Sequence, residues 1–138
     1  MSSSSAAGVR HKLTSASAAD LAKVHDLLNS NSKFMLVVMA DWCGHCVRLK
    51  NGPWKEFVAS PAARKLHIVE LDYDAYTKVA QNDKLGDCVF AKLLKKSVQS
   101  FPYVAMVQQT SEAVNVKMYD GAYPVNAVEL HKFASTKN

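Results

Sequence analysis

The apolar and polar positions along this chain predict a buried sheet flanked by helices. The longest purely apolar run, Phe34–Ala40, spans seven residues and contains two adjacent valines. Its length and β-branched content favour a strand buried on both faces, and such strands belong to parallel or mixed sheets covered by helices. Two further runs, His67–Leu71 and Tyr103–Val107, predict inner strands of the same sheet.

Apolar residues at helical spacing lie between these strands. Ser17–Asn29 predicts a helix in which Ser17 and Asp20 resemble a capping box. Asp87 is a plausible N-cap for an amphipathic helix over Cys88–Lys96. The other expected elements are a short edge strand at Val9–Leu13, a helix from Cys43 to Lys50 that resumes over Trp54–Ala59, a strand at Val114–Tyr119 and a helix at Val125–Phe133. This order, βαβαβαββα, predicts an α/β sandwich around a mixed sheet.

The chain has 138 residues, which suits one domain with one core. Residues 1–8 are rich in serine and alanine, so we expect a flexible N-terminal segment followed by one domain over residues 9–138. The net charge of +5 comes without zinc-finger spacing, an RNP string or a Gly-rich phosphate loop. We therefore expect no nucleic-acid partner. The lysines at positions 92, 95 and 96 form either a solvated helix face or a surface for an acidic partner.

No targeting feature is visible at either end of the sequence. No apolar run approaches the roughly 20 residues of a membrane span, so we expect no membrane association. The N-terminus has no apolar signal region, and Ser135–Asn138 is not a retention tetrapeptide. These features predict a cytoplasmic protein, with the secretory pathway or ER lumen as the alternative if the sequence is truncated.

The chemistry is concentrated in Trp42-Cys43-Gly44-His45-Cys46, which follows the strand Phe34–Ala40 and opens a helix. A cysteine at a helix N-terminus meets free N–H groups and the positive end of the dipole, which makes the Cys43 thiol reactive near neutral pH. The gap of two residues lets the two sulfurs bond within one helical turn. Cys46 is then placed to attack a mixed disulfide formed at Cys43.

Other interpretations of the cysteines are possible. A structural zinc needs four ligands, and only Cys88 and scattered histidines remain outside the pair, so no metal site is expected. Cys88 is either a small buried hydrophobe in an apolar helix or a regulatory or partner-linking thiol in the first turn of that helix.

Three motifs carry a resemblance to a known family. The pentapeptide is followed by Phe101-Pro102, directly before the strand Tyr103–Val107, and by Tyr119-Asp-Gly121 before the last helix. From about residue 9 to residue 135 the chain resembles the thioredoxin superfamily, and its pentapeptide resembles the active-site string of protein disulfide isomerase domains. The resemblance implies a three-layer thioredoxin-like sandwich with a cis bond before Pro102.

The resemblance also implies a role for each residue of the motif. Cys43 would be the attacking thiol, Cys46 the resolving thiol, and His45 would stabilise the Cys43 thiolate. No bound cofactor is implied, because the two cysteines carry both electrons. We expect a monomer that acts on proteins with disulfides or thiols and is recycled by a separate redox partner.

A substrate groove is implied as well. Trp42 would border it, Pro102 would face the sulfurs, and an extended substrate peptide would pair with the backbone of Phe101. Residues 74–100 form a longer link than is usual in the family and predict an inserted helix near this face, which could influence the choice of partner.

The sequence departs from the family at one position important for catalysis. The buried carboxylate usually found six residues before the first cysteine is replaced by Val37. On the neighbouring strand the matching position is Glu70, so we hypothesise that Glu70 relays the proton of Cys46. The alternative is that Glu70 points to solvent and water does the relay. The helix break at Pro53 also lies two residues later than in the family.

The function predicted from these observations is thiol–disulfide oxidoreduction on protein substrates. Gly44-His45 favours a disulfide-isomerase-like oxidase or isomerase. Two alternatives stay open: a cytosolic thioredoxin-type reductase, and a non-catalytic binding or chaperone module that uses the Phe101-Pro102 groove.

Overall fold

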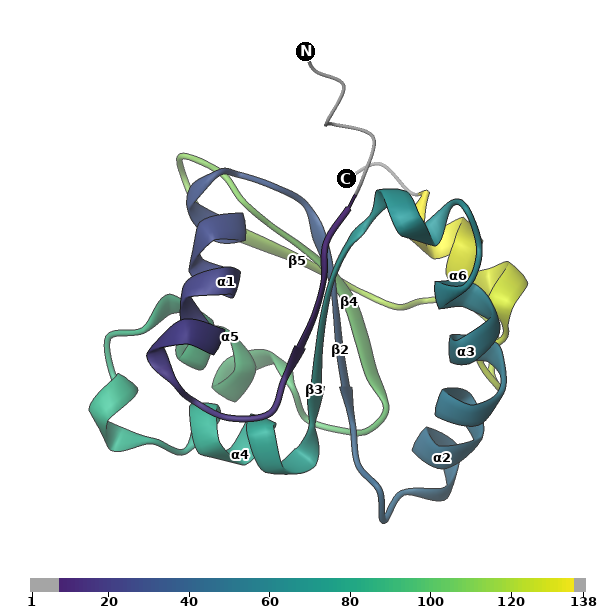
Figure 1. Ribbon diagram of the computed structural model, residues 1–138, viewed down its shortest axis with the longest axis horizontal. Coiled ribbons are helices and arrows are strands. Elements are labelled where there is room, and N and C mark those ends of the chain that lie inside the picture. The colour runs from purple at the N-terminus through teal and green to yellow at the C-terminus, as the bar shows by residue number, and fades with distance from the viewer. Residues whose placement is uncertain (1–7, 136–138) are drawn as a thin grey trace.

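The computed structural model describes residues 8–135. Its middle layer is a five-stranded sheet with the strand order β1-β3-β2-β4-β5, and helices cover both faces (Figure 1). The β1–β3 and β3–β2 pairs are parallel, whereas the β2–β4 and β4–β5 pairs are antiparallel. The predicted three-layer sandwich with a mixed sheet is therefore confirmed.

The elements follow the predicted order. They are β1 (Arg10–Leu13), α1 (Ala18–Asn29), β2 (Phe34–Met39), α2 (Gly44–Asn51), α3 (Pro53–Val58), η2 (Ala63–Lys65), β3 (His67–Asp72), α4 (Tyr73–Ala80), η3 (Asp83–Leu85), α5 (Val89–Ser97), β4 (Tyr103–Gln109), β5 (Val114–Met118) and α6 (Ala127–Ala134). The elements η2 and η3 are short 3-10 helices. Among residues 8–135, no helix is long and apolar enough to cross a bilayer.

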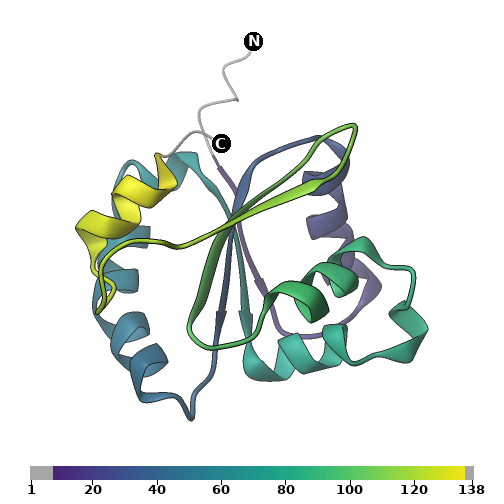
Figure 2. The same cartoon turned by 180° about the vertical axis from the view of Figure 1, so that it is seen from behind.

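Each face of the sheet has its own apolar core. On β2, Phe34, Leu36 and Val38 pack with α1, α4 and α5, whereas Met35 and Val37 pack with α2, α3 and α6. Successive side chains of a strand point to opposite faces, so a strand buried on both faces has an uninterrupted apolar sequence. Seen from either side, the two helix groups lie on opposite sides of the sheet (Figure 2).

The first helix begins as the sequence predicts, although only half of the capping box forms. The Ser17 side chain accepts a hydrogen bond from the backbone N–H of Asp20 at 3.2 Å. The Asp20 carboxylate does not return to Ser17 but accepts a bond from the Ser15 hydroxyl at 3.0 Å. Of the expected N-terminal segment, residues 1–7 lie outside the described residues, and the N–H of Gly8 donates to the carbonyl of Arg64.

The link between β3 and β4 holds two helices, α4 and α5, where the sequence analysis named one. The predicted N-cap at Asp87 is wrong: Cys88 is the N-cap of α5, and its side chain makes no capping bond. The N–H of Cys88 donates to the carbonyl of Leu85 at 3.0 Å, and the backbone at Cys88 is extended. This turn delays the helix by one residue and leaves Asp87 exposed.

Candidate active site

Cys43 lies between the end of β2 and the start of α2. It is the N-cap of α2, and its sulfur accepts a hydrogen bond from the backbone N–H of Cys46 at 3.4 Å. The N–H of Cys43 is itself bonded to the carbonyl of Ala40 at 3.1 Å, which fixes the turn out of the strand. The attacking thiol that the sequence predicts is therefore held at a helix N-terminus, where negative charge on sulfur is favoured.

The two thiols of the motif have pKa values displaced in opposite directions. Burial raises the pKa of Cys43, but hydrogen bonds from the Cys46 thiol and from the backbone N–H groups of Cys46 and His45 outweigh it, so the pKa of Cys43 lies below its usual value. Burial raises the pKa of Cys46 to about 11, and the neighbouring Cys43 adds to this rise. The Cys43 thiol therefore ionises more readily than the Cys46 thiol, which makes Cys43 the better candidate nucleophile and leaves Cys46 in need of a base before it can react.

The two residues between the cysteines face solvent. A Cβ added to Gly44 would meet nothing within 4 Å, so this side of the helix start is open to a partner. His45 is exposed, and its contribution to the Cys43 thiolate is through its backbone N–H.

The Phe101–Pro102 segment lies against Cys43, although it follows it by almost sixty residues. The peptide bond between Phe101 and Pro102 is cis, as the family resemblance implies. The Cys43 thiol donates to the carbonyl of Phe101 over 3.7 Å. The backbone of the expected peptide groove is therefore in direct contact with the candidate attacking sulfur.

An aromatic cluster borders the same sulfur. The Trp42 ring, whose residue is 67% exposed, makes edge contacts with Tyr73 and Phe101 at centroid distances of 5.3 and 5.7 Å. Tyr76 lies 5.7 Å from Phe101 in the same arrangement. The sequence motifs mark Trp42 and Phe101 but neither of the two tyrosines. Tyr73 follows β3 as Trp42 follows β2, and because these strands are parallel, the shared sheet edge could have placed them together.

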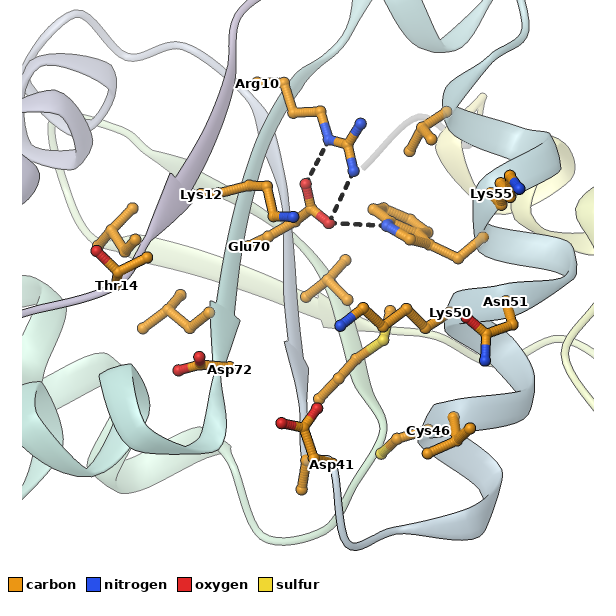
Figure 3. Close-up of a pocket in the computed structure, with 18 residues that line it drawn as sticks. Arg10, Lys12, Thr14, Asp41, Cys46, Lys50, Asn51, Lys55, Glu70 and Asp72 are labelled. Carbon is orange, nitrogen blue, oxygen red and sulfur yellow. Dashed lines mark hydrogen bonds and ion pairs between the residues drawn. The ribbon is translucent and has the colours of Figure 1, made fainter.

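Behind Cys46, a cavity of about 410 Å³ opens between the sheet and helices α2 and α3 (Figure 3). Cys46 is only 1% exposed, yet it lines this cavity together with Val37 and Glu70. The side chains of Lys12 and Lys50 extend into the same space (Figure 3). The cavity gives the resolving cysteine a polar neighbourhood although the usual carboxylate is absent at position 37.

Glu70 lies directly opposite Val37 in the register of β2 and β3, as the proton-relay hypothesis requires. Its carboxylate accepts bonds from Trp54 Nε1 at 2.8 Å and from Arg10 Nη2 at 3.2 Å, and Arg10 Nε forms a second contact. Within residues 8–135 these are its hydrogen-bond partners, and Cys46 is not one of them. The alternative of a fully solvated Glu70 also does not describe the geometry, because its side chain is 12% exposed.

No motif in the sequence marks the two groups that hold Glu70. Arg10 comes from β1, sixty residues earlier, and Trp54 from α3. Among residues 8–135, no three His, Cys, Asp or Glu side chains gather closely enough to hold a metal ion.

Comparison with known proteins agrees with this geometry. The thioredoxin family profile matches residues 19–134, so the chain belongs to the thioredoxin family. No curated protein sequence gives a significant match.

Solved structures show the same fold at low sequence identity. The J-Trx1 fragment of ERdj5 is 18% identical with a TM-score of 0.59, and the alignment covers 90% of this chain and 50% of that fragment. Trxlp from Edwardsiella tarda is 19% identical with a TM-score of 0.52, over 87% of this chain and 95% of that one. Malassezia sympodialis thioredoxin is 14% identical with a TM-score of 0.52, and the alignment covers 91% of this chain and 87% of that one. This chain therefore spans half the length of the ERdj5 fragment.

Proposed function

We propose that this chain is a thiol–disulfide oxidoreductase of the disulfide-isomerase type that acts on protein substrates. The observation that carries the proposal is the pair of thiols at the start of α2. Cys43 has a lowered pKa and touches the cis-proline segment, while Cys46, one turn further along the helix, has a pKa raised to about 11. Such a pair can attack, resolve and release a substrate disulfide.

The reaction balances with the two cysteines alone. The Cys43 thiolate attacks one sulfur of a substrate disulfide, which breaks that bond and releases the other substrate sulfur as a thiolate that takes a proton. The Cys46 thiol then loses its proton to a base and attacks the Cys43 sulfur. This breaks the mixed disulfide, forms a Cys43–Cys46 disulfide and releases the remaining substrate sulfur as a thiolate that takes a proton. Two electrons have passed to the substrate, and a separate redox partner returns them. The reverse sequence oxidises a substrate dithiol.

Binding of the substrate would use the surface around Cys43. An extended peptide could pair with the backbone of Phe101 next to Pro102, as in other strand-addition modes. Trp42, Tyr73 and Phe101 would pack against apolar side chains near the substrate cysteine, since exposed aromatic rings bury large apolar areas at interfaces. We propose that the chain does this as a monomer and without a bound cofactor.

The isomerase direction is tested by comparing two activities of the same preparation. We expect the chain to rearrange the scrambled disulfides of a small protein substrate and to reduce insulin only slowly in the presence of dithiothreitol. The Cys43→Ser, Cys46→Ser double variant should lose both activities. Rapid insulin reduction without rearrangement would instead favour a thioredoxin-type reductase, and full biological function of the double variant would favour a binding module.

For the proton of Cys46 we propose that Glu70 is the acceptor, reached through water in the cavity that both residues line. Oε2 of Glu70 is engaged by Arg10 alone, which leaves it a lone pair for a proton. Glu70→Gln should slow resolution of the mixed disulfide by about 100-fold between pH 6 and 8, at the lower end of general-base effects. Rapid-quench analysis of the mixed disulfide measures this step.

Arg10→Gln is the matched control, because it removes the same ion pair but keeps the carboxylate. We expect Arg10→Gln to resolve the mixed disulfide at nearly the native rate. Equal slowing in both variants would mean that the ion pair acts only on structure, and an unchanged rate in Glu70→Gln would refute the relay.

A further inference from the structure

A second thiol lies beside a base on the face of the sheet opposite α2, the helix that carries Cys46. The Nε2 atom of His25, in α1, is 3.2 Å from the sulfur of Cys88, the N-cap of α5. Both side chains are half-buried, so the pair is accessible from solvent. Cys88 packs against the core of the α1, α4 and α5 face, whereas Cys46 lines the cavity between the sheet and α2.

This arrangement can activate a nucleophile. With Nε2 as the unprotonated nitrogen, the imidazole can take the proton of the Cys88 thiol directly, which is the general way in which a neighbouring histidine activates cysteine. Cys88 is also the N-cap of α5, but its side chain makes no capping hydrogen bond, so activation of the thiol rests on His25. His25 and Cys88 are 63 residues apart in the sequence.

A cationic hollow adjoins the pair. A cavity of about 500 Å³ is lined by Gly86, two residues before the cysteine, by Lys92 and Lys95 on α5, and by one carboxylate, that of Asp83. The backbone N–H of Lys92 donates to the carbonyl of Cys88 at 3.0 Å. Lys92 therefore lies one helical turn from the cysteine. Both lysines are exposed, and neither forms an ion pair within residues 8–135. The two lysines outnumber the single carboxylate of Asp83, so the hollow has an excess of positive charge that suits a small ligand with carboxylate groups.

We propose that Cys88 is a modification site that exchanges with an anionic low-molecular-weight disulfide of the glutathione class. His25 takes the thiol proton, and the Cys88 sulfur attacks one sulfur of the disulfide. The S–S bond breaks, a mixed disulfide forms on Cys88, and the second half of the reagent leaves as a thiolate that takes the proton from His25. The proposal does not depend on the function of the Cys43–Cys46 pair.

The adduct should persist. The other two cysteines of the chain are Cys43 and Cys46, and Cys46 is separated from Cys88 by the sheet. Cys46, the proposed resolving thiol, is therefore not placed to remove a mixed disulfide from Cys88, in contrast to one formed on Cys43.

The test uses the full chain with Cys43 and Cys46 joined as a disulfide, glutathione disulfide as the probe, and peptide mass spectrometry to locate the adduct. We expect the adduct on Cys88, and His25→Gln should slow its formation by at least about tenfold. His11→Gln replaces another half-buried histidine and should leave the rate unchanged. In guanidinium chloride, where the pair is no longer held together, native and His25→Gln chains should react equally.

The ligand class is tested with a second probe, the neutral 2-hydroxyethyl disulfide. In a Lys92→Gln, Lys95→Gln variant, glutathione disulfide should react with Cys88 about two- to fivefold more slowly, which is the size of surface charge effects. The reaction of the neutral probe with Cys88 should keep its rate. Equal rates in folded native and His25→Gln chains, or no adduct on Cys88, would overturn the site. Equal slowing of both probes in the lysine variant would overturn the assignment of an anionic reagent.

Discussion

Replacing Cys46 with serine will stop the reaction after its first step and leave the substrate joined to Cys43 by a disulfide. In the native chain, the resolving thiol lies one helical turn from the attacking sulfur. Groups held in this way act with effective concentrations that can reach about 10⁵ M, far above about 1 mM of an external thiol. Release of substrate should therefore slow by at least about 1000-fold.

Non-reducing electrophoresis with mass spectrometry measures the trapped complex. Cys88→Ser is the matched control, since it also removes one thiol but leaves the active-site pair, and it should accumulate no complex. A Cys46→Ser chain that turns over at the native rate would contradict the assignment of Cys46 as the resolving thiol.

Replacing Phe57 with alanine will lower the free energy of unfolding by about 3–5 kcal/mol. Phe57 is 0% exposed and joins two helices, because its ring lies 5.6 Å from Trp54 on α3 and 4.9 Å from His131 on α6. Its removal leaves a cavity next to the helix that supplies Trp54 to Glu70. The loss is large beside the roughly 5–15 kcal/mol that stabilises a typical domain.

Urea denaturation followed by circular dichroism gives the free energy of unfolding. Val128→Ala is a suitable control, since Val128 lies on α6 but is 63% exposed, and we expect a change within about 0.5 kcal/mol. A loss of less than about 1 kcal/mol in Phe57→Ala would contradict the packing described for this face.

Most of the fold can be predicted from the sequence because local patterns and burial agree. The run Phe34–Ala40 has no polar residue, and both of its faces are covered. The N-cap at Ser17 forms as expected, and the helix that begins after Cys43 breaks at Gly52 before Pro53. The prediction that Asp87 is the N-cap of α5 was wrong. The turn from Leu85 to Cys88 determines where the helix starts, although Asp87 has the better capping side chain.

The candidate site was predictable only where a motif marks it. The pentapeptide and Phe101-Pro102 identified the sulfur and its neighbouring backbone, and the two are in contact. The partners of Glu70 and the partner of Cys88 come from elements distant in sequence, Arg10 and His25. No local pattern encodes such contacts, since they depend on the register of β1 with β3 and on where α1 lies beside α5.

The most direct test of the proposed function is the reduction potential of the Cys43–Cys46 pair. Equilibration with glutathione buffers, followed by the fluorescence of Trp42 and Trp54, gives the potential. The lowered pKa of Cys43 stabilises the reduced form, and Gly44-His45 resembles the motif of disulfide isomerase domains, so we predict a reversible two-electron couple near about −180 mV. A potential near about −270 mV would contradict the isomerase assignment in favour of a reductase, and the absence of a reversible couple would contradict the oxidoreductase itself.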